Sequence, residues 1–216
     1  MCSQKKTCND KCDRNKLIID AAYKMFVKYK IEGTTFQMIA KEAGVGVATV
    51  FRHYSDKADL AIKVISMKWK ECLEAALKNR SLDEIEKSTA VERLEYTLNA
   101  YIYLYCYKKD FLVFNDNFNH YMAHEDVDKE RFSEYYTVTS EVSRRFHFLY
   151  EKAKKDHTIR TDISEDKLLR ILLHTMMSAC AHYAGGIIWA ANENEDYKDE
   201  LLMVKAMILE FATKGV

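Results

Sequence analysis

The 216-residue chain contains no proline and only six glycines. All-β and βαβ folds need many tight turns, and those turns draw heavily on glycine and proline. No window of 18 residues is apolar and free of charge, so no segment is predicted to span a membrane. The composition therefore predicts an all-α fold in a chain long enough to bury a core.

The chain also lacks a net charge, because its 33 basic residues balance its 33 acidic residues. The charges are unevenly distributed, because residues 1–60 carry 11 basic and 7 acidic side chains and the remainder is net negative. Such asymmetry is typical of a chain whose two parts have different roles. The first residues (MCSQKKTCNDKCDR) are polar and lack an apolar run ahead of a cleavage site, so we expect a soluble, cytoplasmic protein without disulfides.

Three of the six cysteines, Cys2, Cys8 and Cys12, lie in residues 1–12, which we expect to be a flexible N-terminal arm. Their spacing lacks the CxxC pairs of a zinc module, which favours the arm over metal binding or redox sensing. The metal alternative stays open at this point, and we expect no cofactor.

Three of the six glycines fall within 14 residues near the start of the chain. Ahead of them, apolar residues recur at helical spacing and predict a helix over about residues 13–30, which Gly33 is expected to end in the left-handed conformation. Thr35 is expected to cap a second, short helix that ends at Gly44. A third helix is predicted over about residues 47–54.

Two short helices joined by a glycine turn form the pattern of a helix-turn-helix, whose second helix can lie in the DNA major groove. Val50 and Tyr54 are expected to face inward, and residues 47–49, 52 and 53 outward. An unrelated helical hairpin would give the same pattern, so the residues alone leave both interpretations open.

The string EGTTFQMIAKEAGVGVATVFRHYSDKADL resembles the N-terminal signature of the tetracycline-repressor (TetR) family of transcriptional regulators. The residues at signature positions are Thr35, Ile39, Ala40, Ala43, Gly44, Val45, His53, Lys57 and Leu60, with Phe51 and Tyr54 as aromatic replacements. The resemblance covers about residues 14–62. It implies a three-helix helix-turn-helix domain over residues 13–58 and a larger helical domain for ligand binding and dimerisation over residues 59–216.

The resemblance further implies a homodimer that binds a double-stranded DNA operator, most often as a repressor, and that responds to a small-molecule effector. The family's DNA contacts carry over to Thr35, Gln37, Val47, Ala48, Thr49, Phe51, Arg52, His53 and Lys57. The chain departs from the family pattern at Gly46, Ala48 and Phe51, which weakens the expected anchoring to the DNA backbone. The apolar tip of the third helix suits thymine methyl groups, so we expect two inverted half-sites rich in A·T pairs.

Aromatic residues crowd the middle of the chain, where 15 of the 26 lie between residues 96 and 150. They predict either a bulky core or a pocket, and the many tyrosine hydroxyls, which need partners when buried, favour a pocket. The residues expected to line it are Tyr101, Tyr105, Phe114, Phe118, Tyr121, Tyr136, Phe146, His174, Met177 and Cys180. Such a lining fits an amphipathic, partly aromatic effector.

One group of metal-binding residue types stands out, because Asp116, His120 and His124 lie four residues apart and share a helix face. This spacing can bind a divalent metal. The polar neighbours that favour a solvated helix face instead are Asn115, Asn117, Asn119 and Asp126. The solvated face is the preferred interpretation, with the metal as the alternative.

The rest of the chain is also predicted to be helical. The expected helices cover about residues 57–79, 91–107, 111–121, 127–155, 168–191 and 201–211, with a loop at 80–87, a cap at Ser55 and Asp56, and a cap at Ser164. The last two helices are expected to form the dimer interface. No phosphate loop, GxSxG or HExxH motif occurs, so we expect no enzyme activity. The alternative function is an effector-independent activator or architectural DNA-binding protein, which would have a filled core in place of a pocket.

Overall fold

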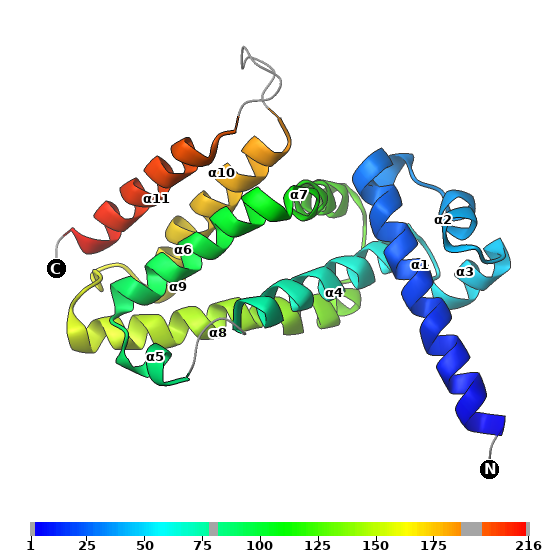
Figure 1. The fold of residues 1–216 in the computed structure, drawn as a ribbon, viewed down its shortest axis with the longest axis horizontal. Helices are drawn as coiled ribbons and strands as arrows, with labels where there is room; N and C mark the ends of the chain where they lie inside the picture. Colours follow the sequence, from blue (N-terminus) through cyan, green and yellow to red (C-terminus); the bar gives the residue numbers. More distant parts are fainter. Residues whose placement is uncertain (1–2, 78–81, 187–195, 215–216) are drawn as a thin grey trace. The chain divides into compact units, whose positions relative to one another are not determined.

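The computed structural model describes residues 3–77, 82–186 and 196–214, and every regular element in these ranges is a helix (Figure 1). The helices are α1 (Ser3–Gly33), α2 (Phe36–Ala43), α3 (Val47–His53), α4 (Lys57–Leu77), α5 (Leu82–Lys87), α6 (Ala90–Tyr107), α7 (Lys109–His124), the 3-10 turn η1 (Lys129–Phe132), α8 (Ser133–Asp156), α9 (Glu165–Leu169), the π-helical turn η2 (Arg170–His174), α10 (Thr175–Ala184) and α11 (Lys198–Thr213). None of the helices described is both long enough and apolar enough to cross a membrane. The predicted all-α fold class is confirmed.

The helices form two compact units. The first comprises the residues up to Lys70 together with Phe114–Thr137, and the second comprises Glu71–Val113 and Val138–Val216. The first unit is larger than the domain expected for residues 13–58, because it includes most of α7 and the start of α8. Helices α4, α7 and α8 each run from one unit into the other.

The core of the first unit collects apolar side chains from the N-terminal helices and from α7. Ile39 of α2, Val50 of α3 and Leu60 of α4 are fully buried, and Phe26 of α1 is almost so. The ring of Phe114 on α7 stacks on Phe26 with 5.8 Å between the ring centroids. Each large apolar side chain buried in this way stabilises the unit by ~1.5–3 kcal/mol.

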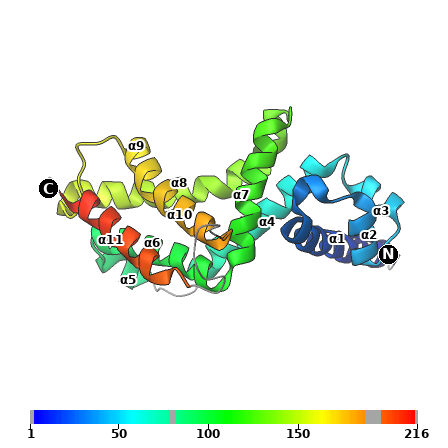
Figure 2. The same ribbon diagram turned by 90° about the horizontal axis from the view of Figure 1, so that it is seen from above.

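The core of the second unit lies where α6, α10 and α11 pack on one another (Figure 2). Leu94 and Leu98 of α6, Cys180 of α10 and Leu201 of α11 are fully buried. Not every apolar side chain of these helices is buried, because Tyr103 of α6 and Met203 and Met207 of α11 are more than half exposed.

Helix α1 differs from its prediction at both ends. It continues back to Ser3 through the residues expected to form an arm, where neither glycine nor proline interrupts the helix. At the other end Lys30, and not Gly33, has a positive φ, of 58°. Gly33 is the last residue of α1, as predicted, but its predicted left-handed conformation is wrong, because the positive φ lies three residues earlier.

Other elements also differ from their predictions. The loop expected at 80–87 contains α5, and the single helix expected over 127–155 begins with η1, which Asp128 caps through the Glu130 amide. Ser164 precedes α9, but its side chain makes no capping hydrogen bond. The helix expected over 168–191 starts at Glu165 and includes a π-helical turn, and its last residues lie outside the described ranges.

Candidate DNA-binding site

The turn between α2 and α3 is built from backbone groups. The Thr35 hydroxyl caps α2 by accepting a hydrogen bond from the Met38 amide, at 3.3 Å. Gly44 ends α2 in the left-handed conformation, with φ at 66°. The next amide, of Val45, donates to the Ala40 carbonyl at 3.0 Å and closes the turn. The predicted roles of Thr35 and Gly44 are confirmed.

Gly46 directly precedes α3 and supplies no side-chain cap, as its sequence implies. The Gly46 carbonyl accepts a hydrogen bond from the Thr49 amide at 2.8 Å. A Cβ at Gly46 would meet only the Thr49 hydroxyl oxygen, 4.0 Å away, and φ there is −72°. The start of α3 therefore does not require glycine, in contrast to the end of α2.

The inward side of α3 is anchored by Val50, which is fully buried, and by Tyr54 just after the helix. The Tyr54 hydroxyl donates to Asn15 Oδ1 of α1 at 2.8 Å, and burial raises the pKa of Tyr54 to about 12. The ring of Phe51 meets that of Phe36 edge to face, with 4.8 Å between centroids. These contacts fix the rotation of α3 about its axis.

The opposite side of α3 is open to solvent. Ala48, Phe51 and Arg52 are exposed, and Val47, Thr49 and His53 are half-exposed. Phe51 is 57% exposed despite its apolar ring, and Arg52 donates from Nη2 to the Thr49 hydroxyl at 3.0 Å. At the start of α2, Thr35 and Gln37 are exposed as well. Eight of the nine residues expected to contact DNA thus lie at accessible positions on α2 and α3.

The ninth, Lys57, is the first residue of α4, as expected, and is half-exposed. Its ammonium donates to the carbonyls of Ile31 and Glu32 at the end of α1, both at 3.0 Å. It also lies 5.9 Å from the centroid of the Tyr121 ring. A phosphate contact would compete with these bonds for the same ammonium.

The face of α7 around Asp116 was predicted to be solvated. That prediction is wrong for Asn115 and Asn117, which bond to other helices. Asn115 is 6% exposed, and its Oδ1 accepts a hydrogen bond from Trp69 Nε1 at 3.0 Å. Asn117 Oδ1 accepts from the Ile31 amide at 2.9 Å, and its Nδ2 donates to Glu32 Oε2 at 3.1 Å. The sequence contains one indication that Asn117 faces the protein. This residue lies three residues after one buried aromatic residue and four residues before another.

The ion pairs of Arg131 in η1 were also not predicted from the sequence. Its Nη2 donates to Asp56 Oδ1 at 2.6 Å and its Nε to Asp59 Oδ1 at 2.8 Å. Asp56 itself caps α4 by accepting from the Asp59 amide, which confirms its predicted cap. Burial alone would raise the pKa of Asp56, but hydrogen bonds from the Asp59 amide and from Arg131 outweigh it and lower that pKa.

The residues expected to line a ligand pocket divide between the units. In the second unit Tyr101, Tyr105, Phe146 and Cys180 are buried, Met177 is half-buried and His174 is exposed; in the first unit Phe114, Phe118 and Tyr121 are buried and Tyr136 is 53% exposed. The Tyr105 hydroxyl accepts a hydrogen bond from the Tyr197 amide at 3.0 Å. Among the described residues, every fully buried side-chain nitrogen or oxygen has a partner within the protein. Unsatisfied tyrosine hydroxyls therefore do not support a pocket.

Asp116, His120 and His124 are all exposed, and His120 Nε2 lies 3.7 Å from Asp116 Oδ2. This pair is a surface ion pair when the histidine is protonated.

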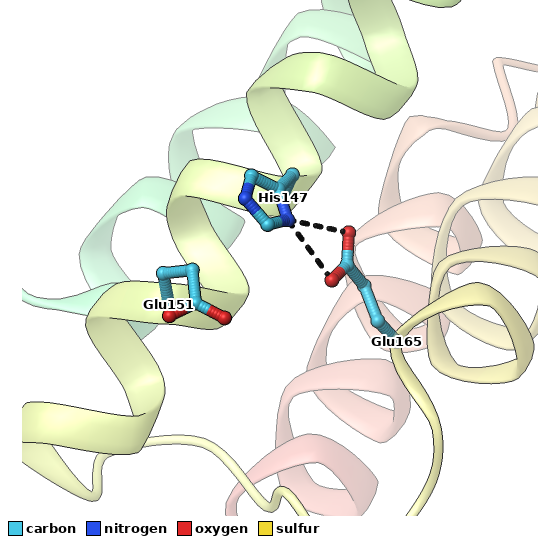
Figure 3. Close-up of side chains that lie close together, drawn as sticks. All are labelled: His147, Glu151 and Glu165. Carbon is cyan, nitrogen blue, oxygen red and sulfur yellow. Dashed lines mark hydrogen bonds and ion pairs between the residues drawn. The ribbon is translucent and has the colours of Figure 1, made fainter.

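A different trio, His147, Glu151 and Glu165, brings its ligand atoms within 4.8 Å of one another in the second unit (Figure 3). His147 Nδ1 lies 3.1 Å from Glu165 Oε2, and the Lys154 ammonium donates to Glu151 Oε1 at 2.6 Å. Because lysine already supplies a positive charge to this group, the trio is accounted for as a surface ion-pair network.

Comparisons with known proteins agree with the helix-turn-helix geometry. Residues 18–64 match the family described as bacterial regulatory proteins, tetR family. A helix-turn-helix-type transcriptional regulator from Staphylococcus aureus (strain bovine RF122 / ET3-1) is 38% identical over 56 residues. That match spans 26% of this chain and 30% of the relative's length, so it covers less than a third of either protein.

The fold as a whole is similar to solved regulators. The transcriptional regulator FadR from Bacillus subtilis, solved in complex with stearoyl-CoA, matches with a TM-score of 0.69 and 16% identity, over 94% of this chain and 99% of that chain. The fatty acid degradation regulator FadR from Bacillus halodurans matches with a TM-score of 0.68 and 14% identity, over 91% and 94%. The family match places residues 18–64 among the helix-turn-helix domains of the tetR family, and the chain as a whole shares its fold with solved transcriptional regulators.

Proposed function

We propose that the chain is a ligand-responsive repressor that binds a palindromic operator as a homodimer and is released by a small amphipathic effector. The observation that carries the proposal is the two-sided build of α3. Val50 anchors the helix inward, while Ala48 and Arg52 stay exposed, which suits insertion into a major groove. As a DNA-binding protein it would act in the cytoplasm, and we propose no enzyme activity.

The contact that each residue is proposed to make with the operator follows from the chemistry of its side chain. The methyl groups of Val47, Ala48 and Thr49 contact thymine methyls, and Arg52 pairs with a guanine or a phosphate. The remaining contacts, to phosphates and sugars, come from Thr35, Gln37, Phe51 and His53. Lys57 adds a positive charge beside these contacts while its ammonium stays bonded to the end of α1.

A dimer is supported by the exposed apolar side chains of α11. Met203 and Met207 are 67% and 69% exposed, and Leu202 and Phe211 are also exposed to more than a third. A face of this kind is commonly covered by a second copy, and the twofold symmetry of a dimer matches an inverted repeat.

An effector is supported by the buried aromatic lining of the second unit and by the fold shared with FadR, which was solved with stearoyl-CoA. We propose that Tyr101, Tyr105, Phe146 and Cys180 line its site. One observation favours the alternative of an effector-independent activator or architectural protein: among the described residues, the buried polar side-chain atoms all have protein partners, as in a filled core.

The experiment that tests the proposal is selection of bound DNA from a random duplex pool, followed by titration at several salt concentrations. We expect an inverted repeat with A·T-rich contacted positions, bound by two chains with salt-sensitive affinity. A non-palindromic, G·C-rich site or no enrichment would contradict the proposal. Stearoyl-CoA is the first effector probe: release of the DNA supports ligand control, and retention through a wider panel of amphipathic compounds supports the alternative.

A further inference from the structure

The end of α1 holds a backbone conformation that side chains other than glycine rarely adopt. Lys30 has φ at 58° and ψ at 169°, a region of the backbone map that is essentially reserved for glycine. A lysine stays in this region only where surrounding contacts over-determine the backbone, and such positions cluster at switches and ligand clamps.

The contacts that hold Lys30 come from three directions. The Thr34 hydroxyl, on a fully buried residue, donates to the Lys30 carbonyl at 2.7 Å. Asn117 of α7 binds the Ile31 amide through Oδ1 and the Glu32 carboxylate through Nδ2. Lys57 of α4 donates to the Ile31 and Glu32 carbonyls, so the three successive carbonyls from Lys30 to Glu32 and the Ile31 amide are bonded to side chains.

We infer that Asn117 is a positioning residue for operator binding, and that Asn117 and Lys57 together form a latch that holds the end of α1 in its strained conformation. The inference rests on the proposed function. The latched segment leads directly through Thr34 into the cap of α2, so its conformation sets the entry of the chain into the helix-turn-helix. Opening the latch lets Lys30 relax and shifts α2 and α3 from the arrangement that fits DNA.

Helix α7 gives the latch a path to the rest of the protein. It is continuous from Lys109 to His124, and its first residues belong to the second unit while Asn117 belongs to the first. Because α7 is one continuous helix, a change in its first turn can be transmitted along the helix to the Asn117 bonds.

The test compares Asn117→Ala with Asn119→Ala, a matched change at an exposed asparagine of the same helix, using the full chain and the DNA selected by the wild-type chain. We expect Asn117→Ala to weaken operator binding at least tenfold and Asn119→Ala to change it less than twofold. Lys30→Gly removes the strain, since glycine adopts positive φ freely. In the Lys30→Gly background the loss caused by Asn117→Ala should shrink to about threefold or less.

Unchanged operator affinity in Asn117→Ala, with only a lower unfolding midpoint, would overturn the inference and leave Asn117 a purely structural residue. Failure of the wild-type chain to select any DNA would instead count against the proposed function. Amide hydrogen exchange then tests the latch without DNA. The latch predicts at least tenfold faster exchange in Asn117→Ala at Ile31 and also at Met38 and Ile39 of α2, whereas acceleration at Ile31 alone would refute it.

Discussion

At the scale of single residues, the N-terminal helices contain two residues with positive φ, Lys30 and Gly44, and the energetic cost of this angle differs between them. Gly44 adopts its angle at no steric cost, whereas Lys30 bears a strain of about 1–3 kcal/mol that the bonds of Thr34, Asn117 and Lys57 offset. The glycine was identifiable from its place between two apolar patterns. The lysine was not, because Asn117, which bonds the next residue Ile31, lies 86 residues further along the chain.

The two glycines around the turn offer a matched comparison. Gly44→Ala should lower the free energy of unfolding by about 1 kcal/mol or more, because an alanine at φ 66° is strained. Gly46→Ala should change it by less than about 0.5 kcal/mol, because φ there is ordinary and a Cβ has room. Urea unfolding measures both, and equal losses would contradict the assignment of the turn.

At the scale of elements, apolar periodicity was enough to place the long helices, since each buries one stripe of side chains. It missed α5 and η1, because elements of 6 and 4 residues are too short to show a period. It also misjudged one face of α7, where Asn115 and Asn117 are polar yet point to protein partners. Polar residues at inward positions of a helix are identified by their tertiary partners, which a single sequence does not display.

Arg131 links η1 to the N-terminal turn of α4 through its ion pairs with Asp56 and Asp59. We expect the contribution of these ion pairs to stability to depend on pH. The pKa of Asp56 is lowered below its ordinary 3.8 in the folded chain, so its contribution to stability is complete above that value and is lost as pH falls through the lowered pKa. Arg131→Met should therefore destabilise the fold by about 1 kcal/mol at pH 7 and by less near pH 3.

Denaturant unfolding of both proteins across this pH range measures the difference. A gap between wild type and Arg131→Met that stayed constant or widened toward acid would show that the ion pairs with Asp56 and Asp59 are not its source.

At the scale of the whole molecule, the sequence was sufficient for the fold class and for which side of α3 is exposed, because both depend on local patterns. The lining of a ligand pocket depends instead on tertiary packing. Its ten expected residues come from both units, and burial alone does not distinguish a pocket lining such as Tyr101 from core. Tyr105, whose hydroxyl is bonded to the Tyr197 amide, illustrates how a backbone group can take the place expected for a ligand.

The dimer proposal predicts that a charge on the exposed face of α11 blocks association. Met207 is 69% exposed in the single chain, so Met207→Glu should leave the fold of the single chain intact. It should raise the dimer dissociation constant more than tenfold, because an unpaired carboxylate would be buried in the interface. Light scattering over a concentration series measures this, and a variant that stays dimeric would place the interface elsewhere.

The central claim is that the outward face of α3 reads DNA, and a charge placed on that face tests it most directly. Ala48→Glu sets a carboxylate at an exposed position of α3, and Ala75→Glu makes the same change at an exposed position of α4. Fluorescence anisotropy with the selected operator should show at least a hundredfold loss of affinity for Ala48→Glu and less than a threefold change for Ala75→Glu, with both variants folded. Equal affinity of the two variants for the operator would contradict the account.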